Sequence, residues 1–112
     1  MVDISYDRDA SCIYANIIGE IDHHGAGAMR EKIDGAIEDY KPATLVLNFK
    51  GVAFMDSSGI GVIMGRYKMT RILGGKVVIY GVKKQIQRII EMSGIDKIIK
   101  ICSSFEEATK LL

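Results

Sequence analysis

The chain has 112 residues, of which 48% are hydrophobic and 26% charged, and 15 basic residues nearly balance 14 acidic ones. A chain of this size can form a single domain over residues 1–112 without disulfides or a structural metal. The balanced charge argues against nucleic-acid binding across a broad basic surface. No apolar run approaches the roughly 18 residues of a membrane-spanning helix, and the N-terminal residues do not form a signal-peptide pattern. We therefore expect a cytoplasmic protein that does not bind membranes.

The spacing of apolar residues predicts alternating strands and helices. Alternation at every second residue predicts two strands, over 4–6 and 12–18, joined by a polar turn. A polar break over 19–25 precedes a predicted helix over 26–40, which ends at Lys41-Pro42. Beyond it we expect a strand over 44–49, a helix over 58–73 closed by Gly74-Gly75, and a strand over 76–80. These are followed by a helix over 85–92 ending at Gly94 and a strand over 98–101. The last expected helix starts at a capping box over 104–107 and continues to Leu111.

This order of elements predicts an α/β fold. It contains a mixed, mostly parallel five-stranded sheet, an N-terminal antiparallel hairpin and four helices. Ligands and partners of open α/β sheets meet the carboxyl ends of the strands. Two polar segments, Asp22-His23-His24 and Asp56-Ser57-Ser58, each follow a predicted strand. We therefore expect both segments on the same rim of the sheet.

Cys12 and Cys102 stand alone, without a Cys-x-x-Cys pattern. They are best explained as reduced, buried side chains. A zinc site would need two further ligands near them, and the sequence offers only His23 and His24. The sequence therefore predicts neither a metal site nor a cofactor.

The most informative segment is Asp56-Ser57-Ser58-Gly59-Ile60-Gly61, where a predicted strand gives way to a helix. A helix N-terminus offers unpaired N–H groups and the positive end of the helix dipole, which suits an attached phosphate. The simpler interpretation makes Ser58 the N-cap of this helix, as Asp22 would cap the preceding one.

Gly61 and Gly65 share one face of the same predicted helix, since they lie four residues apart. Each glycine weakens a helix by roughly 1 kcal/mol relative to alanine. Close packing against the sheet would explain the pair, and so would a flat surface that receives the backbone of another protein. The residues alone leave both explanations open.

A dinucleotide-binding site is a weaker interpretation of the glycines. Gly59, Gly61 and Gly65 superficially match a Gly-rich fingerprint, but they do not directly follow the first strand. The next strand also lacks an acidic residue at its end, and the chain has no Walker pattern.

A hydrolytic site would need Ser58 with His23 or His24 as its base. The sequence lacks the Gly-x-Ser-x-Gly elbow of many hydrolases, and the short chain leaves little room for a substrate pocket. A nucleotide-binding or weakly hydrolytic domain that uses Asp22, His23, Asp56 and Ser58 is therefore the alternative to a protein-binding module.

Over essentially its full length, the chain resembles the STAS domains, and within them the anti-sigma factor antagonists of sporulating bacteria. Three segments carry the resemblance, at 19–24, 54–67 and 92–94, and the Asp-Ser-Ser-Gly core is the most specific of their features. The doubled histidine at positions 23 and 24 resembles the branch that acts on sigma-F.

The resemblance implies a regulatory binding protein that is not an enzyme. Such a protein binds an anti-sigma factor that is also an ATP-dependent serine kinase, and thereby frees a sigma factor, here sigma-F. Phosphorylation of Ser58 would abolish binding, and a PP2C-type phosphatase would restore it. The residues expected to bind the partner are Asp22, His23, Asp56, Ser57, Ser58, Gly59, Gly61 and Gly65.

Physical chemistry agrees with such a switch. A phosphate on Ser58 adds roughly −1.5 to −2 charges at neutral pH. The N–H groups of the helix would stabilise this charge, so the fold should survive the modification. The added bulk would press into a contact surface formed around Gly59 and Gly61, and Asp56 or an acidic partner surface would repel the charge. A local change could therefore abolish docking without refolding.

Overall fold

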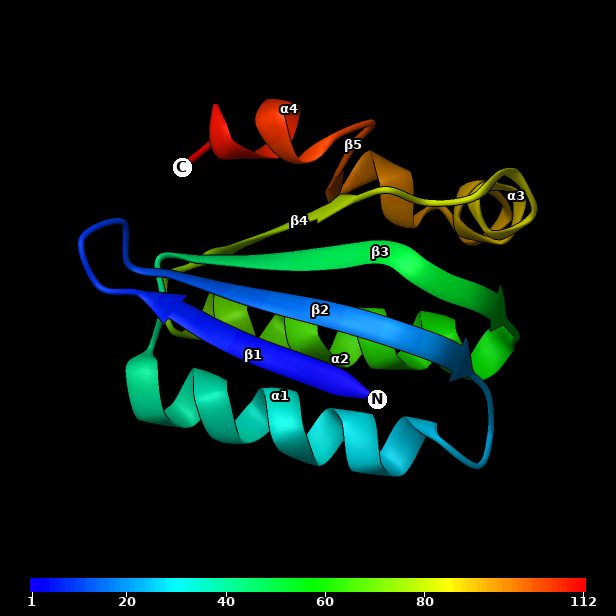
Figure 1. Cartoon of the computed structure of the whole chain (residues 1–112), viewed down its shortest axis with the longest axis horizontal. Coiled ribbons are helices and arrows are strands. Elements are labelled where there is room, and N and C mark those ends of the chain that lie inside the picture. Colours follow the sequence, from blue (N-terminus) through cyan, green and yellow to red (C-terminus); the bar gives the residue numbers. More distant parts are fainter.

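The computed structural model describes residues 1–112 and has one five-stranded sheet at its centre (Figure 1). The strands are β1 (Val2–Asp7), β2 (Cys12–Ile21), β3 (Thr44–Met55), β4 (Lys76–Tyr80) and β5 (Lys100–Cys102). They lie in chain order across the sheet, with β1 antiparallel to β2 and all other neighbours parallel. The predicted mixed sheet with an N-terminal hairpin is confirmed.

The helices are α1 (Ala26–Tyr40), α2 (Ser57–Ile72), α3 (Lys84–Ser93) and α4 (Phe105–Thr109), and a single 3-10 turn spans Ile95–Lys97. The two long helices, α1 and α2, lie side by side on one face of the sheet, whereas α4 lies on the opposite face (Figure 1). No helix is both long and apolar enough to cross a membrane. The prediction of four helices is confirmed.

The main core fills the space between the sheet and the helices α1, α2 and α3. It includes Ile33 and Ile37 from α1, Ile63 from α2 and Leu47 from β3, all nearly or fully buried. A smaller cluster on the other face lies beneath α4 and consists of Cys12, Val46, Val78, Tyr80, Cys102 and Ala108. Both cysteines are free and buried, as predicted.

Strands β2 and β3 extend beyond the predicted ends at residues 18 and 49. Their parallel pairing continues to Ile21 opposite Met55, past two irregularities at each of which β3 has one residue more than β2. The Lys83 Nζ atom donates hydrogen bonds to the carbonyls of Lys50 and Val52, at 2.7 and 3.1 Å. These bonds tie the extended part of β3 to the start of α3. The extension brings both polar segments to the end of the sheet.

The ends of the shorter elements follow local rules. α3 ends at Gly94, which has a φ of 82° that favours glycine. At the start of α4 the Ser104 hydroxyl accepts a hydrogen bond from the Glu107 N–H at 3.2 Å, as expected of a capping box. α4 ends at Thr109 rather than at Leu111, and β5 begins two residues later than predicted because the 3-10 turn precedes it.

Candidate functional site

The two polar segments lie next to each other on one rim of the sheet. Ile21 and Met55 pair at the ends of β2 and β3, and the Asp56 N–H donates to the Ile21 carbonyl at 3.2 Å. The 22–25 loop follows β2, and the 56–59 turn follows β3. The prediction that both segments share a rim is confirmed.

Asp56, rather than Ser58, caps helix α2. Its backbone is extended, and its Oδ1 accepts a hydrogen bond from the Ser58 N–H at 2.8 Å. The interpretation of Ser58 as the N-cap is therefore wrong, because a carboxylate two residues earlier takes that place. Ser57 and Ser58 form the first turn of the helix.

The hydroxyl of Ser58 makes no hydrogen bond within the protein, and its side chain is half-buried, whereas Ser57 is exposed. The first turn of α2 contains no acidic side chain. A helix of this length favours a negative group at its N-terminus by roughly 0.3–1 kcal/mol. Ser58 is thus a free hydroxyl at the positive end of a helix.

The three glycines of α2 differ in their surroundings. Gly59 is buried, and a Cβ added there would collide with the Met55 side chain and lie 3.3 Å from Ile21 Cγ2. The expectation that Gly59 forms part of an open surface is therefore corrected: it lets α2 begin close to the end of β3. Gly61 is exposed and Gly65 half-buried, and a Cβ at either would meet no heavy atom within 4 Å.

Asp22 organises the loop that leads into α1. Its Oδ1 accepts hydrogen bonds from the backbone N–H groups of Gly25 and His24, at 2.8 and 3.0 Å. These bonds, with that of Gly25 the stronger influence, hold the pKa of Asp22 below its usual value. The N-cap position of α1 is Gly25, so Asp22 holds the loop before the helix and does not cap the helix itself.

His23 and His24 are exposed, with their ring centroids 5.8 Å apart and the rings edge to face. Neither imidazole forms a hydrogen bond to Ser58. The structure therefore does not assemble the serine–histidine pair that a hydrolytic site needs. No group of three or more His, Cys, Asp or Glu side chains is arranged to hold a metal ion.

Two features near this site were not anticipated from the sequence. Phe54, directly before Met55, is 51% exposed at the end of β3. Arg66 on α2 is buried and pairs with Asp34 on α1. Arg66 lies four residues from both Val62 and Thr70, which are also buried, so the helical spacing could have indicated its inward position.

Together the mixed sheet, the two long helices on one face and the serine turn at the carboxyl end of β3 define a small α/β binding domain. The chain belongs to the STAS domain family, whose model matches residues 3–108. This confirms the family indicated by the Asp-Ser-Ser-Gly segment.

Characterised relatives cover nearly the whole chain. It is 37% identical over 98 residues to an anti-sigma F factor antagonist of Paenibacillus polymyxa, and the aligned region covers 88% of this chain and 84% of the relative. It is 31% identical over 105 residues to an anti-sigma-B factor antagonist of Bacillus subtilis strain 168, with 94% of each chain covered. Among solved structures, the anti-sigma factor antagonist SpoIIAA in its unphosphorylated form matches with a TM-score of 0.82 and 26% identity, over 97% of this chain and 93% of its own.

Proposed function

We propose that this protein is an anti-sigma factor antagonist that is switched off by phosphorylation of Ser58. Unphosphorylated, it binds an anti-sigma factor and releases the sigma factor, which we take to be sigma-F of sporulation. The observation that carries the proposal is the free Ser58 hydroxyl in the first turn of α2, beside the 22–25 loop. The relatives that act on anti-sigma F and anti-sigma-B factors support the class of partner.

The partner in this proposal is a serine kinase as well as an anti-sigma factor. It transfers the γ-phosphoryl group of ATP to the Ser58 oxygen: the new O–P bond forms, the bond to ADP breaks, and the hydroxyl proton passes to a base of the kinase. One oxygen of the Asp56 carboxylate accepts the Ser58 N–H, and no side chain of this protein hydrogen-bonds the Ser58 hydroxyl, so we assign the base to the kinase. A PP2C-type phosphatase reverses the modification. The protein itself acts by binding and not by catalysis.

The proposed docking surface follows the rim from the 22–25 loop to the exposed side of α2. Its residues are Asp22, His23, Asp56, Ser57, Ser58, Gly61 and Gly65, with Gly59 placing the helix beneath them. The phosphate would lie at the positive end of α2, where backbone N–H groups stabilise it, so the domain stays folded. Its charge and bulk would stand in the middle of the docking surface. Binding is lost because the surface changes and not because the domain unfolds.

Radiolabelled ATP tests the proposal. The protein is incubated with ATP alone and then with the anti-sigma kinase of the source organism, using wild type, Ser58→Ala and Ser57→Ala. Ser57→Ala is the matched control, since it removes a neighbouring exposed hydroxyl. We expect label on wild type and Ser57→Ala only when the kinase is present, and none on Ser58→Ala. Label on Ser58→Ala would contradict the acceptor assignment, and ATP turnover without the kinase would favour the nucleotide-binding alternative.

A further inference from the structure

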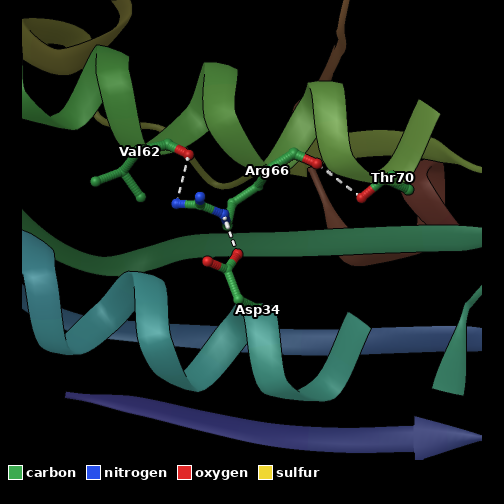
Figure 2. Close-up of polar contacts among 4 residues, drawn as sticks. All are labelled: Asp34, Val62, Arg66 and Thr70. Atoms are coloured by element: carbon green, nitrogen blue, oxygen red, sulfur yellow. Dashed lines mark hydrogen bonds and ion pairs between the residues drawn. The ribbon is translucent and has the colours of Figure 1, made fainter. Parts of the chain in front are cut away.

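The protein has 29 charged Lys, Arg, Asp and Glu side chains, 15 basic and 14 acidic, yet only one salt bridge forms. It joins Arg66 Nε on α2 to Asp34 Oδ1 on α1 at 2.6 Å, between the two helices (Figure 2). The Arg66 side chain is 8% exposed and that of Asp34 is 32% exposed. The one place where opposite charges meet is therefore a largely buried contact between the two helices that lead away from the rim.

Arg66 is also held by its own helix. Its Nη1 donates to the Val62 carbonyl at 3.3 Å, and the Thr70 hydroxyl donates to the Arg66 carbonyl at 2.7 Å (Figure 2). The guanidinium thus lies along α2 toward the turn that carries Ser58, the direction in which helical side chains lean. Asp34 contacts a group whose position along α2 is already set.

The ion pair is a poor source of stability. Arg66 Nε and Asp34 Oδ1 are close but not aligned for a hydrogen bond, and neither atom has another hydrogen-bond partner. Burial lowers the pKa of Arg66, and the charge of Asp34 only partly opposes this. Buried pairs with incomplete hydrogen bonding are often no more stabilising than apolar side chains of similar volume. The contact is better explained by a role in selecting one arrangement of the two helices than by a contribution to the free energy of unfolding.

The other contacts between α1, α2 and the sheet are mainly apolar. Met29 and Ile33 of α1 and Val62 and Ile63 of α2 belong to one buried cluster. The hydrophobic effect itself has no preferred direction, and side-chain packing provides the remaining preference for one position of the helices. A charged pair between two helices brings its opposite charges together at one helix register and separates them at others. The pair therefore adds a charge-based preference for one register to the preference that side-chain packing provides.

We propose that the Arg66–Asp34 pair positions α1 against α2 and so sets the spacing between the 22–25 loop and the 56–59 turn. The loop runs directly into α1 and the turn directly into α2, so a shift between the helices moves one half of the rim relative to the other. Arg66 lies about 12 Å along the helix from Ser58, so both members of the pair are positioning residues. The inference rests on the proposed function, because the partner kinase recognises the rim.

The test replaces the pair by apolar side chains, in the double variant Asp34→Leu/Arg66→Met. Its free energy of unfolding, measured with urea, should equal or exceed that of wild type. Its KM for phosphorylation of Ser58 by the anti-sigma kinase should rise on the order of tenfold with kcat unchanged, because rim recognition weakens while the chemistry at Ser58 does not. The control is Glu38→Gln/Lys41→Gln, which removes one exposed acidic and one exposed basic charge at the end of α1 farthest from the 22–25 loop and should keep the wild-type KM.

A folded double variant with the wild-type KM overturns the proposal. Asp34→Asn provides a second test, since it preserves the side-chain volume and removes only the charge. The KM of Asp34→Asn should also rise, and an unchanged KM would contradict the proposal. Amide hydrogen exchange tests positioning without a partner: exchange in the 22–25 loop should be faster in the double variant than in its control, and equal rates contradict the role. If wild type is not phosphorylated on Ser58, the proposed function fails, and the exchange experiment still decides this inference.

Discussion

Replacing Gly61 by alanine separates fold stability from partner recognition. Gly61 is exposed within α2, and the added Cβ would meet no heavy atom within 4 Å. Alanine is favoured over glycine in an exposed helix interior, so Gly61→Ala should raise the free energy of unfolding by about 0.5–1 kcal/mol. For a domain of this size, the gain corresponds to an increase in Tm of about 2–6 °C.

The same methyl group should weaken binding if the partner packs on this face of α2. Overpacking a close contact costs roughly 1–3 kcal/mol, which corresponds to a loss of affinity of about 5-fold to about 150-fold. Thermal denaturation by circular dichroism measures the first effect, and calorimetric titration with the anti-sigma factor measures the second. We expect Tm to rise while affinity falls.

Gly59→Ala is the contrasting control. There the Cβ would collide with the buried Met55 side chain, and the cost of overpacking, about 1–3 kcal/mol, should outweigh the gain in helix propensity. Gly59→Ala should therefore lower Tm. If Gly61→Ala raises Tm and leaves the affinity unchanged, the docking face is wrongly placed; if it lowers Tm, our description of the helix surface is wrong.

Three further predictions concern the cap, the cysteines and a tyrosine. Asp56→Ala should lower the free energy of unfolding by about 1 kcal/mol, since the Ser58 N–H loses its acceptor. Asp56→Asn should keep most of the wild-type stability, because asparagine also caps helices well. Equal urea midpoints for wild type and both variants would exclude a capping role of Asp56. Burial raises the pKa of Cys12 and Cys102, so neither should react with a thiol reagent at pH 8 until urea unfolds the protein, and rapid native reaction would contradict their burial. Burial also raises the pKa of the Tyr14 hydroxyl from 10.0 to about 12. The neutral Tyr14 side chain therefore contributes fully to the free energy of unfolding below pH 10, and this contribution is lost as the pH rises toward 12. Spectrophotometric titration of wild type and Tyr14→Phe measures the pKa, and ionisation of Tyr14 near pH 10 would contradict the shift.

The order of elements could be predicted because each helix and strand carries its own periodicity. The ends of β2 and β3 could not. Lys50, Gly51 and Ala53 interrupt the apolar alternation of β3, yet the strand continues to Met55 because it pairs with β2 again after each of two irregularities. Pairing between distant segments therefore determined where the strands stop.

Some features of the candidate site could likewise be predicted from the sequence, and others could not. A shared rim followed from strand direction alone, and the segments after β2 and β3 lie on it. Local sequence did not show that Asp56 would displace Ser58 as the cap, because both residue types cap helices well. The burial of Gly59 depends on how α2 is rotated about its axis, and the Arg66–Asp34 pair depends on how two helices meet. These are properties of tertiary packing.

The most direct test of the central claim is the affinity of the anti-sigma factor for this protein before and after stoichiometric phosphorylation of Ser58, measured by calorimetry with the fold monitored by NMR. We expect tight binding of the unmodified protein and a loss of affinity of at least about 100-fold on phosphorylation. Amide shifts should change around the 56–59 turn and remain in place across the sheet. Equal affinity of the two forms would contradict the switch, and loss of binding through general unfolding would contradict its proposed mechanism.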